Sequence, residues 1–399
     1  MRTGRPVRPL TTAAAVLAAL AVAACSGGGG GATAPPGSRV SATSKATASP
    51  TSTATPPPHF TVVMSGDVLL HMALVTQGDQ DAPGPALDFR PMLAEQKPII
   101  GPADLAICHL ETPLADAKGP FSGYPSFNSP PQIVKALVAT GYDACTTASN
   151  HTIDQGFAGV KRTLNALDAA GIKHTGSARS AREAAHTLLL TAGGAKIALL
   201  AYAYATNGIP VPSGRPYSVN LIDPARILRD AKRARAAGAD VVMVALHAGT
   251  EYQQDPNAEQ RRLARILTAS PDIDLVYGHH VHVVQPLQKL NGKWVAYGLG
   301  NTLSHPVADF HVVTAQQIMV RFTFERNSKG RYAVVKAEYV PGIMPLAPPY
   351  RWRDLLTAVD DPSVPAATRQ AWRRAAAHIH EVVGRLGAFK DGLVEAAAP

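Results

Sequence analysis

Short apolar runs alternate with stretches of helical period over most of this chain. Runs typical of buried strands lie at 61–65, 105–108, 144–147, 196–202, 241–246 and 273–277. Amphipathic helical patterns lie at 132–139, 157–170, 224–237 and 258–267. Residues 317–325 and 331–339 predict a β-hairpin with its turn at 326–330. Strands that alternate with helices predict an α/β layered fold, to which the hairpin adds further strands.

The first 58 residues carry a different pattern. Three arginines precede an apolar run at 10–24, and small residues precede Cys25. This order predicts an export signal over residues 1–24. It also resembles the lipobox of bacterial lipoproteins, in which the cysteine is lipidated. The alternative is an ordinary signal peptide followed by a chance cysteine.

Residues 25–58 consist mainly of glycine, alanine, serine, threonine and proline, with Val40 as their one large apolar residue. Such a segment cannot bury a core, so it predicts a disordered tether. A lipid on Cys25 would then anchor the exported protein to the membrane, at the outer face of the bacterial cytoplasmic membrane. We expect a folded domain over 59–345 and a helical, peripheral extension over 346–399.

The formal charge of +9 is unevenly distributed along the chain. Five basic residues and no acidic residue lie in 1–58, which leaves a net charge of +4 for residues 59–399. This balance is a weak argument for nucleic acid, and no nucleic-acid partner is expected. All 14 histidines lie in residues 59–399. Because histidine is a frequent metal ligand and proton carrier, their placement is informative.

Polar side chains gather where five of the predicted strands end. In chain order they are Asp67, His109 with Glu111, Asn150 with His151, His247, and His279 with His280 and His282. In open α/β sheets, ligands bind at the carboxyl ends of the strands. Carboxylates, an amide oxygen and imidazoles are the ligand types that a site for divalent cations needs.

Six motifs in this order resemble the CapA family of capsule-synthesis proteins, which is associated with poly-γ-glutamate production. They lie at 66–70, 110–114, 149–156, 247–252, 278–282 and 299–301. The resemblance runs from about residue 60 to residue 301. It implies the calcineurin-like metallophosphoesterase fold, a four-layer α/β/β/α sandwich with metal ions at the strand ends.

The resemblance also implies roles for single residues. The expected metal ligands are Asp67, Glu111, Asn150, His247, His280 and His282. His151 would be the general acid and Asp154 would orient it. Supporting positions around the ligands are His71, His109, His279 and Asn301. His and carboxylate ligands suit Zn, Mn or Fe.

The sequence departs from the metallophosphoesterase pattern at the first motif. That pattern is Asp-x-His, and Leu69 stands here in place of the histidine. One ion therefore lacks an imidazole unless His71 supplies it. Glu111 replaces the usual bridging aspartate and adds one methylene to that arm. The number of ions, one or two, stays open.

Ordinary structural roles compete with these assignments. Asn150 could cap the following helix, and His247 could be a satisfied core histidine. Three imidazoles within 279–282 are costly to bury without a metal or charged partners, which favours the site. Cys108 and Cys145 lie on predicted buried strands, and a disulfide and free thiols are both open.

Two classes of function remain. The first is a surface-anchored accessory to the synthesis or export of an anionic capsule polymer such as poly-γ-glutamate, acting as a metal-dependent, phosphoesterase-like hydrolase. The polymer or its synthase complex would be the partner, because the chain lacks a Gly-x₄-Gly-Lys-Ser/Thr phosphate-binding loop. The second is a non-catalytic polymer-binding or scaffold lipoprotein that keeps a structural metal site.

Overall fold

A computed structural model describes residues 58–84, 86–306 and 310–398 of the chain. The predicted export signal, Cys25 and almost the whole predicted tether lie outside these residues. Within the described residues, no helix is long and apolar enough to cross a membrane.

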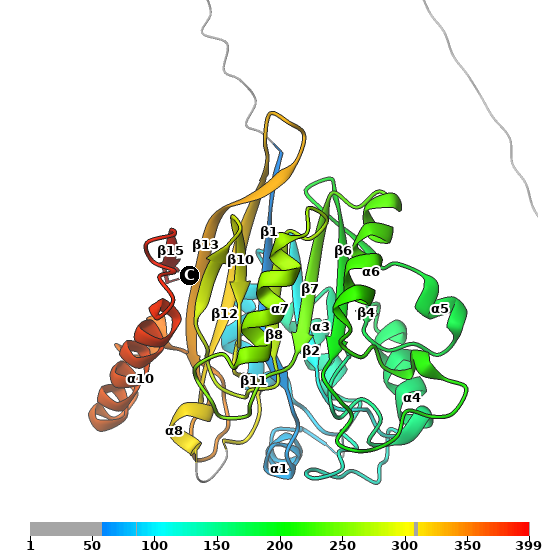
Figure 1. Cartoon of the computed structure of the whole chain (residues 1–399). Helices are drawn as coiled ribbons and strands as arrows, with labels where there is room; N and C mark the ends of the chain where they lie inside the picture. The colour runs from blue at the N-terminus through cyan, green and yellow to red at the C-terminus, as the bar shows by residue number, and fades with distance from the viewer. Residues whose placement is uncertain (1–57, 85, 307–309, 399) are drawn as a thin grey trace, which may run out of the picture. The chain divides into compact units, whose positions relative to one another are not determined.

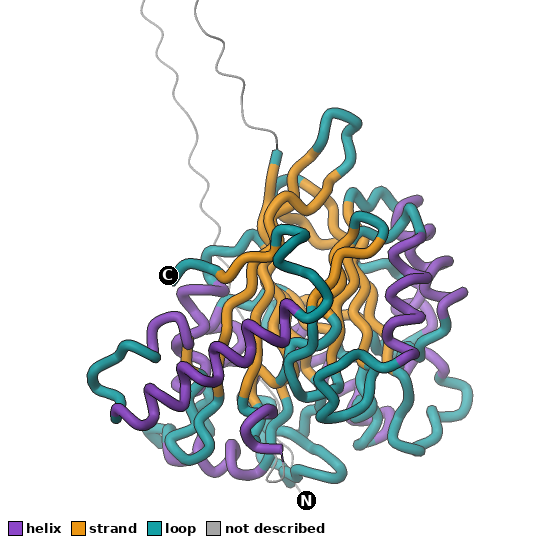
Figure 2. The backbone as a smooth tube through the Cα atoms, turned by 60° about the vertical axis from the view of Figure 1, so that its left-hand side comes forward, coloured by secondary structure: helices purple, strands orange, loops and turns teal. Residues whose placement is uncertain are grey.

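The strands form two sheets, which lie between helices in Figure 1 and Figure 2. The first sheet has nine strands: β14 (Arg353–Asp354), β13 (Tyr332–Ile343), β12 (Gln316–Arg326), β1 (His59–Val68), β2 (Leu105–Leu110), β3 (Ala144–Thr146) and β4 (Lys173–Thr175) in spatial order, with β11 (Asn301–Leu303) beside β1 and β15 (Leu393–Glu395) beside β13. The second sheet has six: β5 (Leu189–Ala192), β6 (Ala195–Ala203), β7 (Val241–His247), β8 (Leu275–His279), β10 (Lys293–Ala296) and β9 (Leu287–Leu290).

The helices connect these strands. They are α1 (Met72–Gln80), α2 (Lys97–Ile100), α3 (Ile133–Thr140), α4 (Gly156–Ala169), α5 (Ala181–Ala185), α6 (Pro224–Ala236), α7 (Ala258–Ala269), α8 (His311–Thr314), α9 (Leu355–Ala358) and α10 (Ala366–Gly384). Short 3₁₀ helices, η1 and η2, lie at Arg90–Gln96 and Pro216–Ser218. The six predicted buried strands, the four predicted helices and the predicted hairpin are all present.

Three apolar clusters separate four layers. Alternate residues of β1 point to opposite faces, so Met64 packs between the sheets with Leu199 and Met243. Val63 points outward and shares a cluster with Leu137 of α3. On the outer face of the second sheet, residues of β6 and β7 pack with α6 and α7. The order of layers is therefore helix, sheet, sheet, helix, and the predicted four-layer α/β/β/α sandwich is confirmed.

The C-terminal part is less peripheral than the sequence predicts. Helix α10 packs on β12 and β13, and its Ile379 is fully buried in the cluster between the sheets. The short strands β14 and β15 both pair with β13, so this part is not purely helical. The C-terminal part is needed because the first sheet extends past the second. Helix α10 covers apolar side chains of the first sheet that have no partner in the second sheet.

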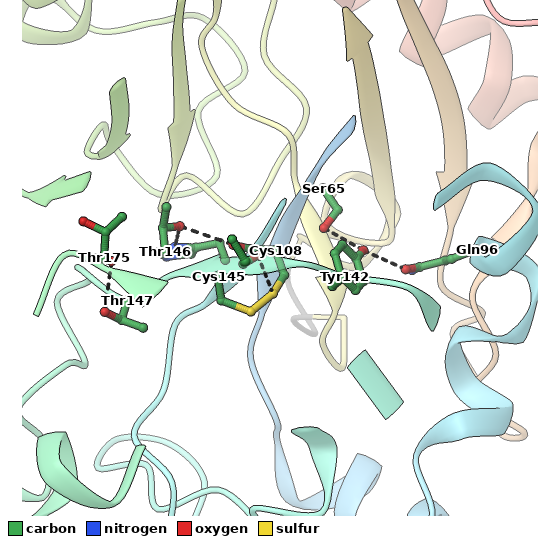
Figure 3. Close-up of a disulfide and its surroundings, with 10 residues drawn as sticks. Ser65, Gln96, Cys108, Tyr142, Cys145, Thr146, Thr147 and Thr175 are labelled. Carbon is green, nitrogen blue, oxygen red and sulfur yellow. Dashed lines mark hydrogen bonds between the residues drawn. A yellow bond between two sulfur atoms is a disulfide. The ribbon is translucent and has the colours of Figure 1, made fainter. Parts of the chain in front are cut away.

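Cys108 and Cys145 form a disulfide between adjacent strands of the first sheet (Figure 3). The two residues are direct partners in the parallel pairing of β2 with β3. Both are buried, at 1% and 0% exposure. The structure thus resolves the choice between free thiols and a disulfide, and places a covalent link directly before His109 and Thr146.

Candidate metal centre

The polar residues at the strand ends converge because the strands that carry them are parallel neighbours. In the first sheet Asp67 of β1 pairs with His109 of β2 on one side and with Asn301 of β11 on the other. In the second sheet His247 ends β7 and pairs with His279, which ends β8. Parallel neighbours end at the same edge of a sheet, so each sheet brings its own set together.

The close approach of β1 to the 299–301 segment requires a glycine. A Cβ on Gly66 would lie 1.9 Å from the carbonyl oxygen of Gly300. The amide of Asp67 donates to that same oxygen at 3.0 Å. Gly66 therefore lets the strand approach closely enough to fix the backbone of Asp67.

Contacts of Asp67 with the 279–280 segment and of His109 with His247 join the polar residues of the first sheet to those of the second. Asp67 Oδ1 lies 2.7 Å from Nδ1 of His279, and its Oδ2 accepts from the amide of His280 at 3.0 Å. Nε2 of His109 lies 2.9 Å from Nδ1 of His247. All of these residues are at most 3% exposed, so this seam between the sheets is dry.

The remaining expected ligands surround these contacts. His247 Nε2 lies 2.6 Å from Asn150 Oδ1 and 3.7 Å from Glu111 Oε1. His282 Nε2 lies 3.9 Å from the same Glu111 oxygen, while its Nδ1 lies 3.5 Å from Asp67 Oδ2. The structure thus brings all six residues expected as ligands into one buried cluster.

Polar atoms in this cluster lack partners, which fits a bound cation. Both carboxylate oxygens of Glu111 are buried without a hydrogen bond among the described residues, and so are Nε2 of His279 and Nδ1 of His280. Burying such groups without a partner costs free energy. Three groups have ligand atoms within 4.8 Å of one another: Asp67, His109 and His279; Asp67, Glu111 and His282; and Glu251, His280 and His282.

The acidic groups have shifted pKa values. Burial opposes ionisation of Asp67, but the hydrogen bond and charge of His279 hold the pKa of Asp67 well below its usual value. Burial raises the pKa of Glu111 well above its usual value, and the charge of Asp67 adds to this. Without a cation, the cluster therefore favours one ionised and one protonated carboxyl.

The pKa values of the imidazoles are also shifted in opposite directions. Burial lowers the pKa of His280 to about 3, and holds those of His109 and His247 well below their usual values. Burial also acts on His282, but Glu111 and Asp67 raise its pKa to about 10. Neutral imidazoles are the form that ligates metals, so His247 and His280 have the charge state that a metal ligand needs.

The expected general acid lies beside the ligand cluster. Nδ1 of His151 lies 2.7 Å from Oδ2 of Asp154, and the backbone amide of Phe127 donates to that same oxygen at 2.8 Å. The ring of Phe127 meets the ring of His151 edge-on at 4.8 Å. Asp154 and Phe127 therefore fix the orientation of the imidazole.

The other expected supporting residues have distinct positions. Asn301 Oδ1 lies 2.9 Å from Nδ1 of His282. His71 bonds instead to Ser304 Oγ at 3.2 Å and packs against Phe127, and it belongs to none of the three candidate groups. The imidazole missing at position 69 is thus not supplied by His71 in this structure.

Three contributors were not identified from the sequence. Thr146 Oγ1 lies 2.8 Å from His109 Nδ1, and Asn207 Oδ1 accepts from the amide of Asn150 at 3.1 Å. Glu251 joins the third candidate group. Glu251 could have been noticed as a carboxylate four residues after His247, whereas a strand threonine and a loop asparagine carry no distinguishing pattern.

Comparisons with known proteins were made for the whole chain. The family model described as bacterial capsule synthesis protein PGA_cap matches residues 61–306. The PGA biosynthesis protein CapA of Bacillus subtilis is 30% identical over 203 residues, covering 50% of this chain and 52% of that protein. The capsule biosynthesis protein CapA of Bacillus anthracis is 28% identical over 174 residues, covering 43% of this chain and 42% of that protein.

Solved structures give a weaker likeness. The calcineurin-like phosphoesterase YfkN from Bacillus subtilis is 15% identical with a TM-score of 0.44, covering 82% of this chain and 100% of that chain. A 5'-nucleotidase precursor from Thermus thermophilus is 15% identical with a TM-score of 0.44, covering 71% and 54%. The fold assignment rests on the two sheets and their helices.

The family model matches more than half of the chain, and the motifs at 66–70 and 278–282 both lie inside the matched region. The chain spans about half the length of the curated relatives. This chain belongs to the bacterial capsule synthesis protein family.

Proposed function

We propose that this protein is an accessory to the synthesis or export of an anionic capsule polymer such as poly-γ-glutamate, and that it acts as a metal-dependent hydrolase. The observation that carries the catalytic part is the buried cluster, above all the two carboxylate oxygens of Glu111, which have no hydrogen-bond partner in the described part of the chain. The polymer class is supported by the family description and by the names of the two CapA relatives.

The residues that would hold one or two divalent cations are Asp67, Glu111, Asn150, His247, His280 and His282. When bound, a divalent cation would supply Lewis acidity toward a substrate oxygen and a more acidic water. The chain itself supplies orientation. Asn301 contacts His282 and so orients its ring, and the contact of His109 with His247 orients the imidazole of His247.

His151 is placed to hold a proton. With hydrogen on Nδ1, the ring donates to Asp154, which leaves Nε2 as the nitrogen that can carry a proton to a leaving group. The side chain of Asp154 is 1% exposed, so its charge acts on His151 with little screening by water.

A hydrolysis assay tests the catalytic part of the proposal. We expect Mn²⁺-loaded full chain to cleave a nitrophenyl phosphodiester, and His151→Gln to slow turnover by about 10²–10⁴-fold with metal content unchanged. His186→Gln is the matched control, because His186 is exposed and outside the cluster. Equal turnover in His151→Gln and the wild type would exclude this role of His151.

A complementation experiment separates the hydrolase from a scaffold. Cells that lack the chain are expected to lose surface polymer, and a Glu111→Gln variant made at the same level is expected not to restore it. Full restoration by this variant would instead support the non-catalytic polymer-binding lipoprotein.

We also propose that a lipid on Cys25 anchors the chain at the outer face of the cytoplasmic membrane. Support comes from the small residues before Cys25 and the basic and apolar segments that precede them. The Cys25→Ser variant is expected to be released from the membrane fraction. Membrane retention equal to that of the wild type would contradict the anchor.

A further inference from the structure

The loop after β7 is held against the loop that carries His280 and His282. Gly249 has a φ of +141°, and a Cβ there would lie 2.3 Å from Cγ1 of Val281. The amide of Tyr252 donates to the carbonyl oxygen of Val281 at 2.8 Å. Residues 248–252 therefore pack directly on 280–282, and only a glycine at 249 permits this approach.

This packing brings a third acidic group to the two histidines. Ligand atoms of Glu251, His280 and His282 lie within 4.8 Å of one another. Glu251 is exposed, whereas both histidines are buried. A carboxylate and two imidazoles around one point are a common ligand set for Zn, Mn or Fe ions.

A second observation points to a ligand at this place. His280 is 3% exposed, and its Nδ1 has no hydrogen-bond partner among the described residues. Its φ of 88°, and that of 57° at His282, lie in a region that residues other than glycine rarely adopt. Such backbone strain often accompanies functional sites.

Glu251 is not already neutralised by a basic side chain. Among the residues that the structure describes, it forms no ion pair with a lysine or arginine. Its charge instead raises the pKa of Tyr252 to about 12, after burial as the larger cause. The Tyr252 hydroxyl also hydrogen-bonds to this carboxylate, which has further lone pairs for a cation.

We propose that Glu251, His280 and His282 form an outer cation site, separate from the inner ligands Asp67, Glu111, Asn150 and His247, with Glu251 as a direct ligand. The outer site rests on the proposed function in one respect, because both require a cation at this edge of the sheets. The outer ion binds more weakly, because Glu251 is exposed to water. It makes the centre dinuclear even though Leu69 offers no ligand atom.

Calorimetric titration of the metal-free full chain with Mn²⁺ tests this assignment. The wild type is expected to bind two ions. Glu251→Gln is expected to keep the tighter ion and to weaken the second by more than about tenfold. Asp255→Asn is the matched control, since Asp255 is an exposed carboxylate on the same loop outside the candidate group, and it is expected to bind like the wild type.

The possible results separate the two proposals. Identical titrations for Glu251→Gln and the wild type, or a single ion in the wild type that Glu111→Gln removes, would overturn the outer site and leave the proposed function standing. A wild type that binds no ion would overturn both. Circular dichroism checks that each variant is folded, and Glu251→Asp, with a shorter arm, is expected to bind the second ion with intermediate affinity.

Discussion

The two sheets contribute opposite kinds of ligand to the candidate metal centre. Of the six ligands expected from the sequence, the first sheet and the loops after its strands supply Asp67, Glu111 and Asn150, whereas the second sheet and its loops supply His247, His280 and His282. Each set alone would bury groups without partners. Only where the sheets meet do acid and imidazole stabilise each other, as in the contact of Asp67 with His279.

The first sheet is also the one that is reinforced. Its β2 and β3 are joined by the disulfide and it is extended by β14 and β15, while the described cysteines include none in the second sheet. We expect the acidic half of the site to depend on these links, because buried carboxylates need partners held at fixed positions.

The largest effect is expected at Glu111. Metal at about 1,000 times its Kd is expected to stabilise the wild type by about 4.1 kcal/mol. Glu111→Gln is expected to lose most of that gain while its metal-free melting temperature stays equal or rises, because a neutral amide replaces a buried acid that has no hydrogen-bond partner among the described residues. Thermal melts with and without Mn²⁺ measure this.

Glu338→Gln is the control for this prediction. Glu338 is also a buried acid of the first sheet, but Arg321 contacts it at 3.0 Å, away from the site. It is expected to lower the metal-free melting temperature and keep the full gain from Mn²⁺. If Glu111→Gln kept that gain as well, Glu111 would not be a ligand.

Removing the disulfide is expected to have the next largest effect. Cys108→Ala with Cys145→Ala opens a link between residues 37 apart in the chain, which is expected to cost about 2–4 kcal/mol of unfolding free energy. Urea unfolding of the oxidised wild type and the double variant measures it. An unchanged midpoint would show that the first sheet does not depend on this link.

Asp354 lies in the part of the first sheet that extends past the second, and its ionisation is expected to change the stability of the folded protein. Burial, aided by the charge of Glu95, raises its pKa to about 6, above the value near 3.9 of an unfolded chain. The folded protein therefore loses stability as the pH rises from about 4 to 6. Asp354→Asn, which can still cap α9, is expected to remove up to about 2 kcal/mol of that loss.

Melting temperatures at pH 4.5 and 7.5 measure this pH dependence. Asp361→Asn is a control of opposite sign, because the hydrogen bond from Ser363 lowers the pKa of Asp361. An equal effect of Asp354→Asn at both pH values would refute the prediction.

The smallest effect is expected at the seam itself. Thr146→Val removes the hydroxyl that bonds His109 and is expected to weaken metal binding by about tenfold. Thr147→Val is the matched control, because Thr147 bonds instead to Thr175 (Figure 3) and to Ser177. Equal affinity in the two variants would mean that the orientation of His109 does not matter.

The hydrophobic pattern predicted a layered α/β fold, and the resemblance to the CapA family implied its four layers and the six expected ligands. Hydrophobic period located the strands, and polar residues at their carboxyl ends had to share an edge, because parallel neighbours end together. The placement of Asp67 beside His109 is of this kind. The roles of His151 and of Cys25 are still predictions.

Tertiary structure alone decided how the two sets meet. The contact of Asp67 with His279 joins residues 212 apart, and that of His109 with His247 joins residues 138 apart. The position of Glu251 depends likewise on how closely Gly249 approaches Val281. Such contacts follow from the stacking of one sheet on the other, which depends on the packing of the whole apolar core and leaves no local pattern in the chain.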